Sequence, residues 1–323
     1  MSKGIRIGLW FGLAAMVLVS AVVLMLPLPL PSTSVATVAG RPRPQTLDLS
    51  ALDGRAPAQP LDFLFIHHSC GGQLMADLGA EVGTNSINVS SPNGGGLRSL
   101  LERNNYRTHE ASYGSRLGEH TDVFDWLPKF RDHLDELLAL DIQDTSFTNG
   151  QRNRIVAFKS CFPNNAFEAE GTAPGNPSGP HLTVANAQAA YTPLVEIFGE
   201  HPDTLFICLT TPPLAPPRPQ PLWKQLLHQL RGRVSWNVRS AALAREFNQW
   251  LSDTNGWLKD SGLTNVVVFD YYDILTDHGA SDFCRYPTGG GYDSHPSHAG
   301  NQKAAEAFVP FLNRAVRRAG LAP

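Results

Sequence analysis

A serine with two histidines, a cysteine and two glycines around it stands at the end of a short apolar run. The run LDFLFI (61–66) is followed at once by HHSCGG (67–72). Serine is a weak nucleophile at its own pKa, so it needs a base within hydrogen-bond reach and donors for the developing oxyanion. We therefore take Ser69 as the candidate nucleophile and its own backbone N–H as one candidate oxyanion donor.

The stretch YDSHPSHAGN (292–301) near the C-terminus offers a candidate base. Proline follows His295 and stiffens the loop, and Asp293 stands close enough along the chain to orient an imidazole ring. This stretch directly precedes the last predicted helix, where a loop can place a histidine over a crevice. We predict His295 as the base and Asp293 as its partner; the structural alternatives are a surface histidine and an Asx turn.

Two further polar stretches offer oxyanion donors. Gly114 ends the stretch SYG (112–114), and Asn164 lies in SCFPNN (160–165). A backbone N–H and a side-chain amide are both suitable donors. Asn165 competes with Asn164 for this role, and a plain turn remains the alternative at each position.

Apolar runs recur along the chain and predict the strands that position these residues. Their continuous apolar character is typical of strands buried on both faces by helices. A more polar segment, YRTHEASYG (106–114), fits an edge strand. The four apolar runs are LDFLFI (61–66), RIVAF (154–158), TLFICLT (204–210) and NVVVFDYY (265–272).

Between the strands lie segments with apolar residues at helical spacing, over 123–140, 237–258 and 301–318. Strands that alternate with helices imply a parallel sheet with right-handed crossovers. The fold class is therefore α/β, a three-layer α/β/α domain with a mostly parallel sheet of about five strands. In such sheets the ligand crevice lies beyond the carboxyl ends of the strands, where Ser69, Gly114 and Asn164 should converge.

In this order the residues resemble the sequence blocks of the SGNH or GDSL hydrolase superfamily. The blocks are Ser69 after the first strand, Gly114 after the second, Asn164 after the third, and HPSHAGN (295–301) before the closing helix. The resemblance covers most of residues 61–318. It implies a flavodoxin-like sheet, Ser69 as nucleophile, Ser69, Gly114 and Asn164 as oxyanion donors, His295 as base with Asp293 as its partner, and no metal or cofactor.

This chain departs from the family pattern at three places. HHSCGG replaces the usual glycine, aspartate, serine opening, and SCFPNN replaces glycine, x, asparagine, aspartate. The family aspartate usually stands three residues before the histidine, whereas Asp293 stands two before His295. A main-chain carbonyl or another acid is therefore the alternative partner for this base.

The N-terminal region predicts export. Lys3 and Arg6 precede an uncharged run over 7–26, which orients the rest of the chain outward. Residues 1–30 are predicted to be a cleaved signal peptide or a retained membrane anchor, and the length of the run favours the anchor. A linker rich in proline follows over 31–60, and the hydrolase-like domain covers 61–323. The domain is thus expected outside the cytoplasm, secreted or tethered.

Charge and cysteines limit the partners. The formal net charge of -3 over 323 residues leaves no basic stripe for nucleic acid. Four cysteines, Cys70, Cys161, Cys208 and Cys284, allow one or two disulfides in an oxidising compartment, but their pairing and the oligomeric state do not follow from sequence. Cys208 lies inside the run FICL and is predicted to be a buried thiol.

The predicted function is an extracytoplasmic serine esterase that hydrolyses an acyl ester on a small molecule or a glycan, with acetyl as the acyl group that family analogy suggests. An O-acyltransferase using the same serine and histidine is the first alternative. A metal-dependent hydrolase is the second, because several histidines and a carboxylate could form a metal site. Against it, His67 and His68 are adjacent on a strand, so their side chains point to opposite sides. A non-catalytic binding or scaffold protein is the third. The metal alternative would use His67, His68, Asp293, His295 and His298.

Overall fold

The computed structural model describes residues 44–83, 87–221 and 236–323 of the chain. The predicted signal or anchor over 1–30, with its apolar run 7–26, and the first part of the predicted linker lie outside these residues. Within the described ranges no helix is long and apolar enough to cross a membrane.

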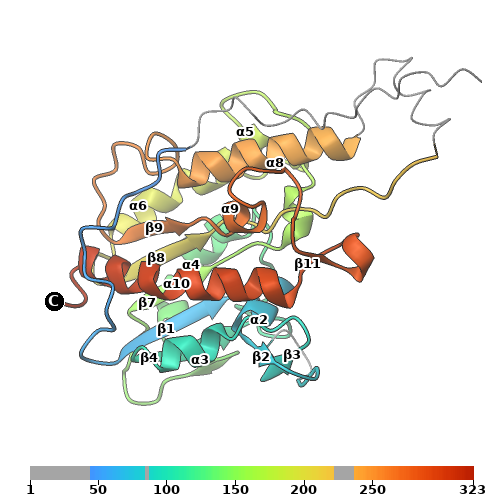
Figure 1. The fold of residues 1–323 in the computed structure, drawn as a ribbon. Coiled ribbons are helices and arrows are strands. Elements are labelled where there is room, and N and C mark those ends of the chain that lie inside the picture. Colours follow the sequence, from blue (N-terminus) through green and yellow to red (C-terminus); the bar gives the residue numbers. More distant parts are fainter. Residues whose placement is uncertain (1–43, 84–86, 222–235) are drawn as a thin grey trace, which may run out of the picture. The chain divides into compact units, whose positions relative to one another are not determined.

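A seven-stranded sheet forms the centre of the domain (Figure 1). All neighbouring strands run parallel except β5 and β6, which are antiparallel. The five longest strands follow the flavodoxin-like order 2-1-3-4-5, which confirms the predicted α/β fold with two more strands than expected. In spatial order the strands are β6 (Thr145–Ser146), β5 (Leu140–Ile142), β4 (Tyr106–Ala111), β1 (Leu61–Ile66), β7 (Ile155–Phe158), β8 (Leu205–Leu209) and β9 (Val266–Phe269).

The prediction that the polar segment 106–114 is an edge strand is wrong. Strand β4 lies inside the sheet, between β1 and β5. Two of its polar side chains are buried and paired: His109 bonds Asp62 at 3.1 Å, and Glu110 forms an ion pair with Arg98. Buried polar groups are tolerated when their hydrogen bonds are satisfied, so the polarity of this segment does not reflect exposure to solvent.

Helices cover both faces of the sheet and include the three that the sequence predicts, α4, α8 and α10 (Figure 1). Pro128 stands in the first turn of α4, where proline is tolerated. One layer contains α2 (Ser69–Met75), α3 (Leu97–Glu102), α9 (Tyr271–Leu275) and α10 (His298–Arg318). The other contains α4 (Trp126–Leu138), α5 (Val184–Tyr191), α6 (Leu194–Gly199) and α8 (Trp236–Ser252). The short elements are β2 (Asp77–Leu78), β3 (Ser90–Ser91), β10 (Pro287–Thr288), β11 (Asp293–Pro296), and the 3-10 helices η1 (Phe162–Asn165) and η2 (Gly289–Gly291).

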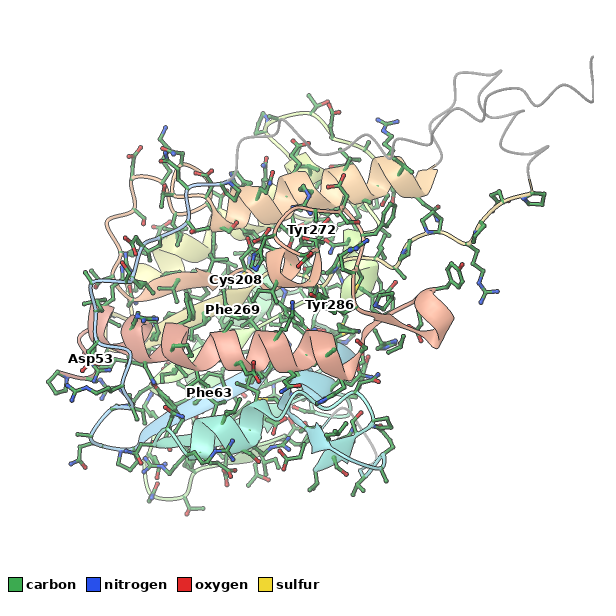
Figure 2. The ribbon with its side chains drawn as sticks, viewed as in Figure 1. Asp53, Phe63, Cys208, Phe269, Tyr272 and Tyr286 are labelled. Carbon is green, nitrogen blue, oxygen red and sulfur yellow. The ribbon has the colours of Figure 1, made fainter. Side chains whose placement is uncertain are left out.

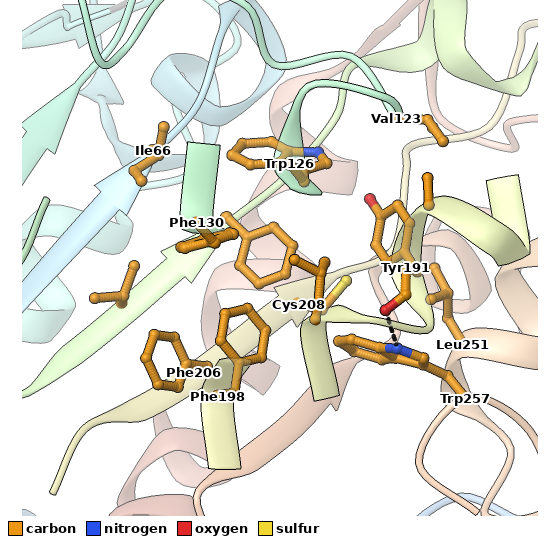
Figure 3. Close-up of a cluster of buried hydrophobic side chains, with 14 of the residues drawn as sticks. Ile66, Val123, Trp126, Phe130, Tyr191, Phe198, Phe206, Cys208, Leu251 and Trp257 are labelled. Carbon is orange, nitrogen blue, oxygen red and sulfur yellow. Dashed lines mark hydrogen bonds between the residues drawn. The ribbon is translucent and has the colours of Figure 1, made fainter. Parts of the chain in front are cut away.

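Alternate residues of the long central strands enter two separate cores. Leu64 and Ile66 of β1 join the core beneath α4, α5, α6 and α8, which Figure 3 shows as a cluster of aromatic rings. Phe63 of the same strand and Phe269 of β9, both labelled in Figure 2, face the other layer and pack against Phe308 of α10. A strand buried on both faces needs this continuous apolar character, as the sequence predicts.

The described part of the predicted linker packs against the domain. Leu49 is buried, and the carbonyl oxygens of Gly54 and Arg55 accept hydrogen bonds of 2.8 Å from Asn313 and Arg317 of α10. These contacts give residues 44–60 fixed partners on the closing helix.

Asp270, directly after β9, makes the stability of the fold depend on pH. Its carboxylate accepts bonds from the Thr210 hydroxyl and the Asp273 N–H, and desolvation raises its pKa from 3.8 to about 6. The folded state then holds this proton more tightly than the unfolded chain does. The stabilisation that Asp270 contributes is therefore fully present below about pH 4 and is lost as pH rises through about 6.

We expect Asp270→Asn to remove this pH-dependent loss of stability, because asparagine does not titrate, while its side-chain oxygen can still cap the helix. Between pH 4 and pH 7 the free energy of unfolding should fall less in the variant than in the natural chain, and the two falls should differ by at most about 3 kcal/mol. Urea unfolding at pH 4, 5, 6 and 7 measures it. Identical pH profiles for the two proteins would contradict the assignment.

Candidate active site

Ser69 is the first residue of α2 and stands just beyond the carboxyl end of β1. His68 precedes the helix in extended conformation, with φ of -120° and ψ of 177°, so the chain turns sharply from strand to helix. Gly71 allows the close approach of this turn, because a Cβ there would lie 2.4 Å from the Cβ of His67. The Ser69 N–H has no partner within the helix, as for every first-turn residue, and remains a candidate donor.

The side chain of Ser69 contacts sulfur and a phenol. Its Oγ lies 3.4 Å from Sγ of Cys161 and 4.0 Å from Sγ of Cys70. It is also a hydrogen-bond partner of Tyr113, whose pKa is raised mainly by desolvation. Cys161 in turn lies 3.2 Å from the ammonium of Lys159, which is fully buried.

Asp293 and His295 form a pair on β11. Nδ1 of His295 lies 2.7 Å from Oδ1 of Asp293, which also accepts the His295 backbone N–H at 3.0 Å. Desolvation raises the pKa of Asp293, but these two hydrogen bonds outweigh it and hold the pKa below its ordinary value. With Nδ1–H donated to the carboxylate, Nε2 presents its lone pair to another partner.

The Asp293 and His295 pair lies at the same edge of the sheet as Ser69. The ring of His295 packs edge-on against Phe162, with centroids 5.0 Å apart, and Phe162 follows the cysteine that contacts Ser69. Strand β11 also approaches α2. Among the described residues, no direct hydrogen bond joins His295 to Ser69. Catalytic hydrogen bonds are often long or absent without substrate, so this geometry is compatible with a serine and base pair.

The two asparagines of η1 have different surroundings. Both N–H groups of the Asn165 side chain donate to main-chain oxygens, of Thr211 and Pro212, at 2.9 Å each. Asn164 donates to Asp122 at 2.7 Å. An amide nitrogen carries two N–H groups, and the described contacts of Asn164 use one of them. Asn165 therefore supports the fold, and Asn164 is the one with a donor to spare.

Gly114 lies in the loop after β4 and has a φ of 81°. Its N–H donates to the carboxylate of Glu119 at 3.2 Å. The backbone N–H that the sequence predicts as an oxyanion donor is thus already hydrogen-bonded to a carboxylate oxygen. Glu119 must turn away before Gly114 can serve a substrate.

His67 and His68 point to opposite sides, as the sequence predicts. His67 is buried and bonds Glu110 at 2.9 Å beneath the sheet edge. His68 stacks on Tyr113 with centroids 3.7 Å apart and bonds the main-chain oxygen of Gly118 at 3.0 Å. Desolvation lowers the pKa of His68 and favours its neutral form.

The histidines of the alternative metal site do not meet. His298 bonds the main-chain oxygen of Gly94 at 2.6 Å, and His67 is engaged with Glu110. In the described ranges, no group of three or more histidine, cysteine, aspartate or glutamate side chains is arranged to hold a metal ion.

Sequence reasoning did not assign a role to Lys159 or Tyr113, and it considered His68 only as a ligand of the alternative metal site. The sequence did place Lys159 and Tyr113 near the site. Lys159 directly follows the run RIVAF, and Tyr113 lies in SYG after β4, so both residues stand at the carboxyl end of a parallel strand, at the same edge of the sheet. Sequence gave no sign that Lys159 would be buried against Cys161.

Comparisons with known proteins found similar structures only. No family model and no curated protein matches the chain. A carbohydrate esterase whose active site displays divergent catalytic and non-catalytic binding functions is 14% identical, with 79% of this chain and 65% of that chain covered and a TM-score of 0.34. A family two carbohydrate esterase from Clostridium thermocellum, in complex with cellohexaose, is 13% identical over 82% and 66%, with a TM-score of 0.32.

A carbohydrate esterase family 2 enzyme with a carbohydrate binding domain, from Corynascus thermopiles (Myceliophthora fergusii), is 15% identical over 81% and 68%, with a TM-score of 0.37. The chain spans just under two thirds of the length of the first two structures. Because the identities and TM-scores are low, the fold class rests on the strand order of the sheet itself.

Proposed function

We propose that this chain is a serine esterase of SGNH type that hydrolyses an acyl ester. The observation that carries the proposal is the Asp293 and His295 pair, 2.7 Å apart, on a strand that approaches the helix begun by Ser69. A nucleophile, a base and a group that orients the base are the three parts that acyl transfer to serine requires.

In the proposed reaction the Oγ of Ser69 attacks the acyl carbon while Nε2 of His295 takes the hydroxyl proton. The carbonyl oxygen becomes an oxyanion in the tetrahedral intermediate. When the intermediate collapses, the bond to the alcohol oxygen breaks and the proton on His295 passes to that oxygen. Water, activated by the same histidine, then releases the acid from the acyl-serine. Asp293 stabilises the imidazolium that forms in both halves.

The oxyanion would be held by the N–H groups of Ser69 and Gly114 and by the amide of Asn164. The second N–H of the Asn164 amide and the Ser69 N–H, which has no partner within its helix, support this role. The Gly114 N–H joins them once Glu119 is displaced. Donors already oriented in this way contribute most of the stabilisation of such intermediates.

The proposed substrate class is acetyl or other short acyl esters on carbohydrate. It follows from the SGNH resemblance and from an extracytoplasmic site, which rests on the sequence of residues 1–30. Transfer of the acyl group to a sugar hydroxyl would use the same residues, with water replaced by the acceptor.

The test is labelling of the full-length chain with a fluorophosphonate, in which the serine oxygen displaces fluoride from phosphorus. We expect the adduct on Ser69, located by peptide mass spectrometry, and its formation should survive a chelator. His295→Ala should slow labelling by about 10³-fold, and Asp293→Asn by about 10²-fold, because the base is lost or misoriented.

His181→Ala is the matched control, since His181 is exposed and bonds Glu168 through Nδ1 at 2.9 Å in the same way. It should label like the natural chain. A folded natural chain with no adduct on Ser69, or labelling that persists in His295→Ala, would overturn the proposal.

A further inference from the structure

A second reactive cluster lies directly beneath Ser69 and takes no part in the proposed acyl transfer. Cys70 is fully buried, Cys161 is 8% exposed and Lys159 is fully buried. The sulfur of Cys161 lies 3.2 Å from Nζ of Lys159 and 3.4 Å from Oγ of Ser69. The two cysteines follow adjacent strands, Cys70 in the first turn of α2 after β1 and Cys161 just before η1 after β7, because β1 pairs with β7 and Ile66 stands opposite Phe158.

The two thiols have opposite acidities. The thiol and the N–H of Cys70 donate hydrogen bonds to Cys161, and these bonds, with the charge of Lys159, hold the pKa of Cys161 well below its usual range despite desolvation. The pKa of Cys70 is raised well above its usual range, because its thiol bonds Cys161 and is desolvated. One thiolate beside one protonated thiol is the state from which thiol–disulfide exchange begins.

The other two cysteines lack this environment. Burial raises the pKa of the Cys208 thiol, and it raises that of Cys284 to about 11. Cys208 belongs to one hydrophobic core and Cys284 to the other. Apolar burial makes a thiol inert, so these two serve as internal controls.

We propose that Cys70 and Cys161 form a reversible disulfide beneath Ser69, that Lys159 stabilises the reduced pair, and that oxidation of the pair raises the reactivity of Ser69. The oxidant is a disulfide of low molecular weight such as oxidised glutathione. The Cys161 thiolate attacks one of its sulfurs and releases one glutathione thiolate, which gives a mixed disulfide. Cys70 passes its proton to the glutathione thiolate already released, and its sulfur displaces the second glutathione from Cys161. Two protein thiols are thereby oxidised by two electrons, and one external disulfide is reduced to two thiols.

The effect on Ser69 follows from charge, and this part rests on the proposed function. In the reduced pair Oγ of Ser69 lies 3.4 Å from the sulfur of Cys161, and a thiolate there would accept a hydrogen bond from the Ser69 hydroxyl and oppose the negative charge that develops on attack. The disulfide carries no charge and releases the hydroxyl for the base. We expect the oxidised chain to react with fluorophosphonate about tenfold faster or more.

The first experiment equilibrates the full-length chain in glutathione buffers of increasing oxidation, alkylates free thiols after denaturation, and maps them by mass spectrometry. We expect one linked peptide that joins Cys70 to Cys161, with Cys208 and Cys284 alkylated throughout. No Cys70 to Cys161 linkage at any glutathione ratio would overturn the disulfide.

Lys159→Met should favour the disulfide, because the thiolate loses its cation, and should shift the glutathione midpoint about tenfold toward reducing conditions. Lys259→Met, at an exposed lysine, is the control. A midpoint that does not move would overturn the role of Lys159. If Lys159→Met does not fold, Cys70→Ser tests whether Lys159 stabilises the Cys161 thiolate. In that variant Cys161 should still react with iodoacetamide at neutral pH faster than Cys208 and Cys284, and equal rates would overturn the role of Lys159.

The second experiment labels the oxidised and reduced forms with fluorophosphonate. Faster labelling of the oxidised form supports the proposal, and equal rates would overturn the control of Ser69. An absence of adduct in both forms would overturn the proposed esterase function and the control of Ser69 with it, while the linked peptide would still establish the disulfide.

Discussion

Ser69→Ala is expected to lower kcat/KM for 4-nitrophenyl acetate by about 10⁴-fold or more. The alanine leaves the oxyanion donors and the base in place but removes the atom that forms the acyl-enzyme. What remains should be close to the activity that binding and oxyanion stabilisation provide by themselves. Initial rates over a range of substrate concentrations, with the protein shown to be folded by circular dichroism, measure the effect.

Ser112→Ala is the matched control for Ser69→Ala. Ser112 lies at the same edge of the sheet, after β4, is fully buried, and its hydroxyl has no hydrogen-bond partner among the described residues. Its removal should leave kcat/KM within about twofold, because no bond is lost. If Ser69→Ala hydrolysed the ester as fast as Ser112→Ala, the nucleophile would lie elsewhere.

Phe130→Ala is expected to destabilise the domain strongly, by about 3–5 kcal/mol. Phe130 of α4 is fully buried at the centre of the cluster in Figure 3. Its ring packs against Trp126, Phe158, Phe198 and Phe206, with centroids 4.9 to 6.1 Å apart. The alanine leaves a cavity that the rigid neighbouring rings, two from helices α4 and α6 and two from strands β7 and β8, cannot fill, and each aromatic pair is lost.

Chemical unfolding in urea at neutral pH measures this loss. Phe283→Ala provides the comparison, because Phe283 is only half-buried and should cost about 1 kcal/mol. Equal midpoints for the two variants would show that the α4 cluster relaxes to fill the space. The slopes of the transitions should match, since both variants expose the same chain on unfolding.

Much of the architecture could be predicted because its signals are local. Apolar runs such as LDFLFI and TLFICLT predict strands buried on both faces, and both occur as β1 and β8. The rule that crevices form beyond the carboxyl ends of parallel strands then places the residues after these runs at one edge. Ser69, Gly114 and Asn164 follow β1, β4 and β7, which are neighbours in the sheet.

The features that were missed depend on partners far along the chain. The β4 segment reads as an edge strand until Asp62 and Arg98 are placed beside its histidine and glutamate. The choice between Asn164 and Asn165 is also invisible in the sequence, because it depends on which main-chain oxygens, those of Thr211 and Pro212 among them, consume the donors.

The sequence by itself predicted the order of strands and helices, the edge of the sheet where Ser69, Gly114 and Asn164 follow their strands, and Asp293 as the first candidate partner of His295. Periodicity and chain order carry that information without reference to distant residues. Only the tertiary structure decided that a buried lysine and two cysteines lie under Ser69, and that a glutamate covers Gly114. The contact of Ser69 with Cys161 joins residues 92 positions apart, and a buried charge such as that of Lys159 depends on the partners that folding brings to it.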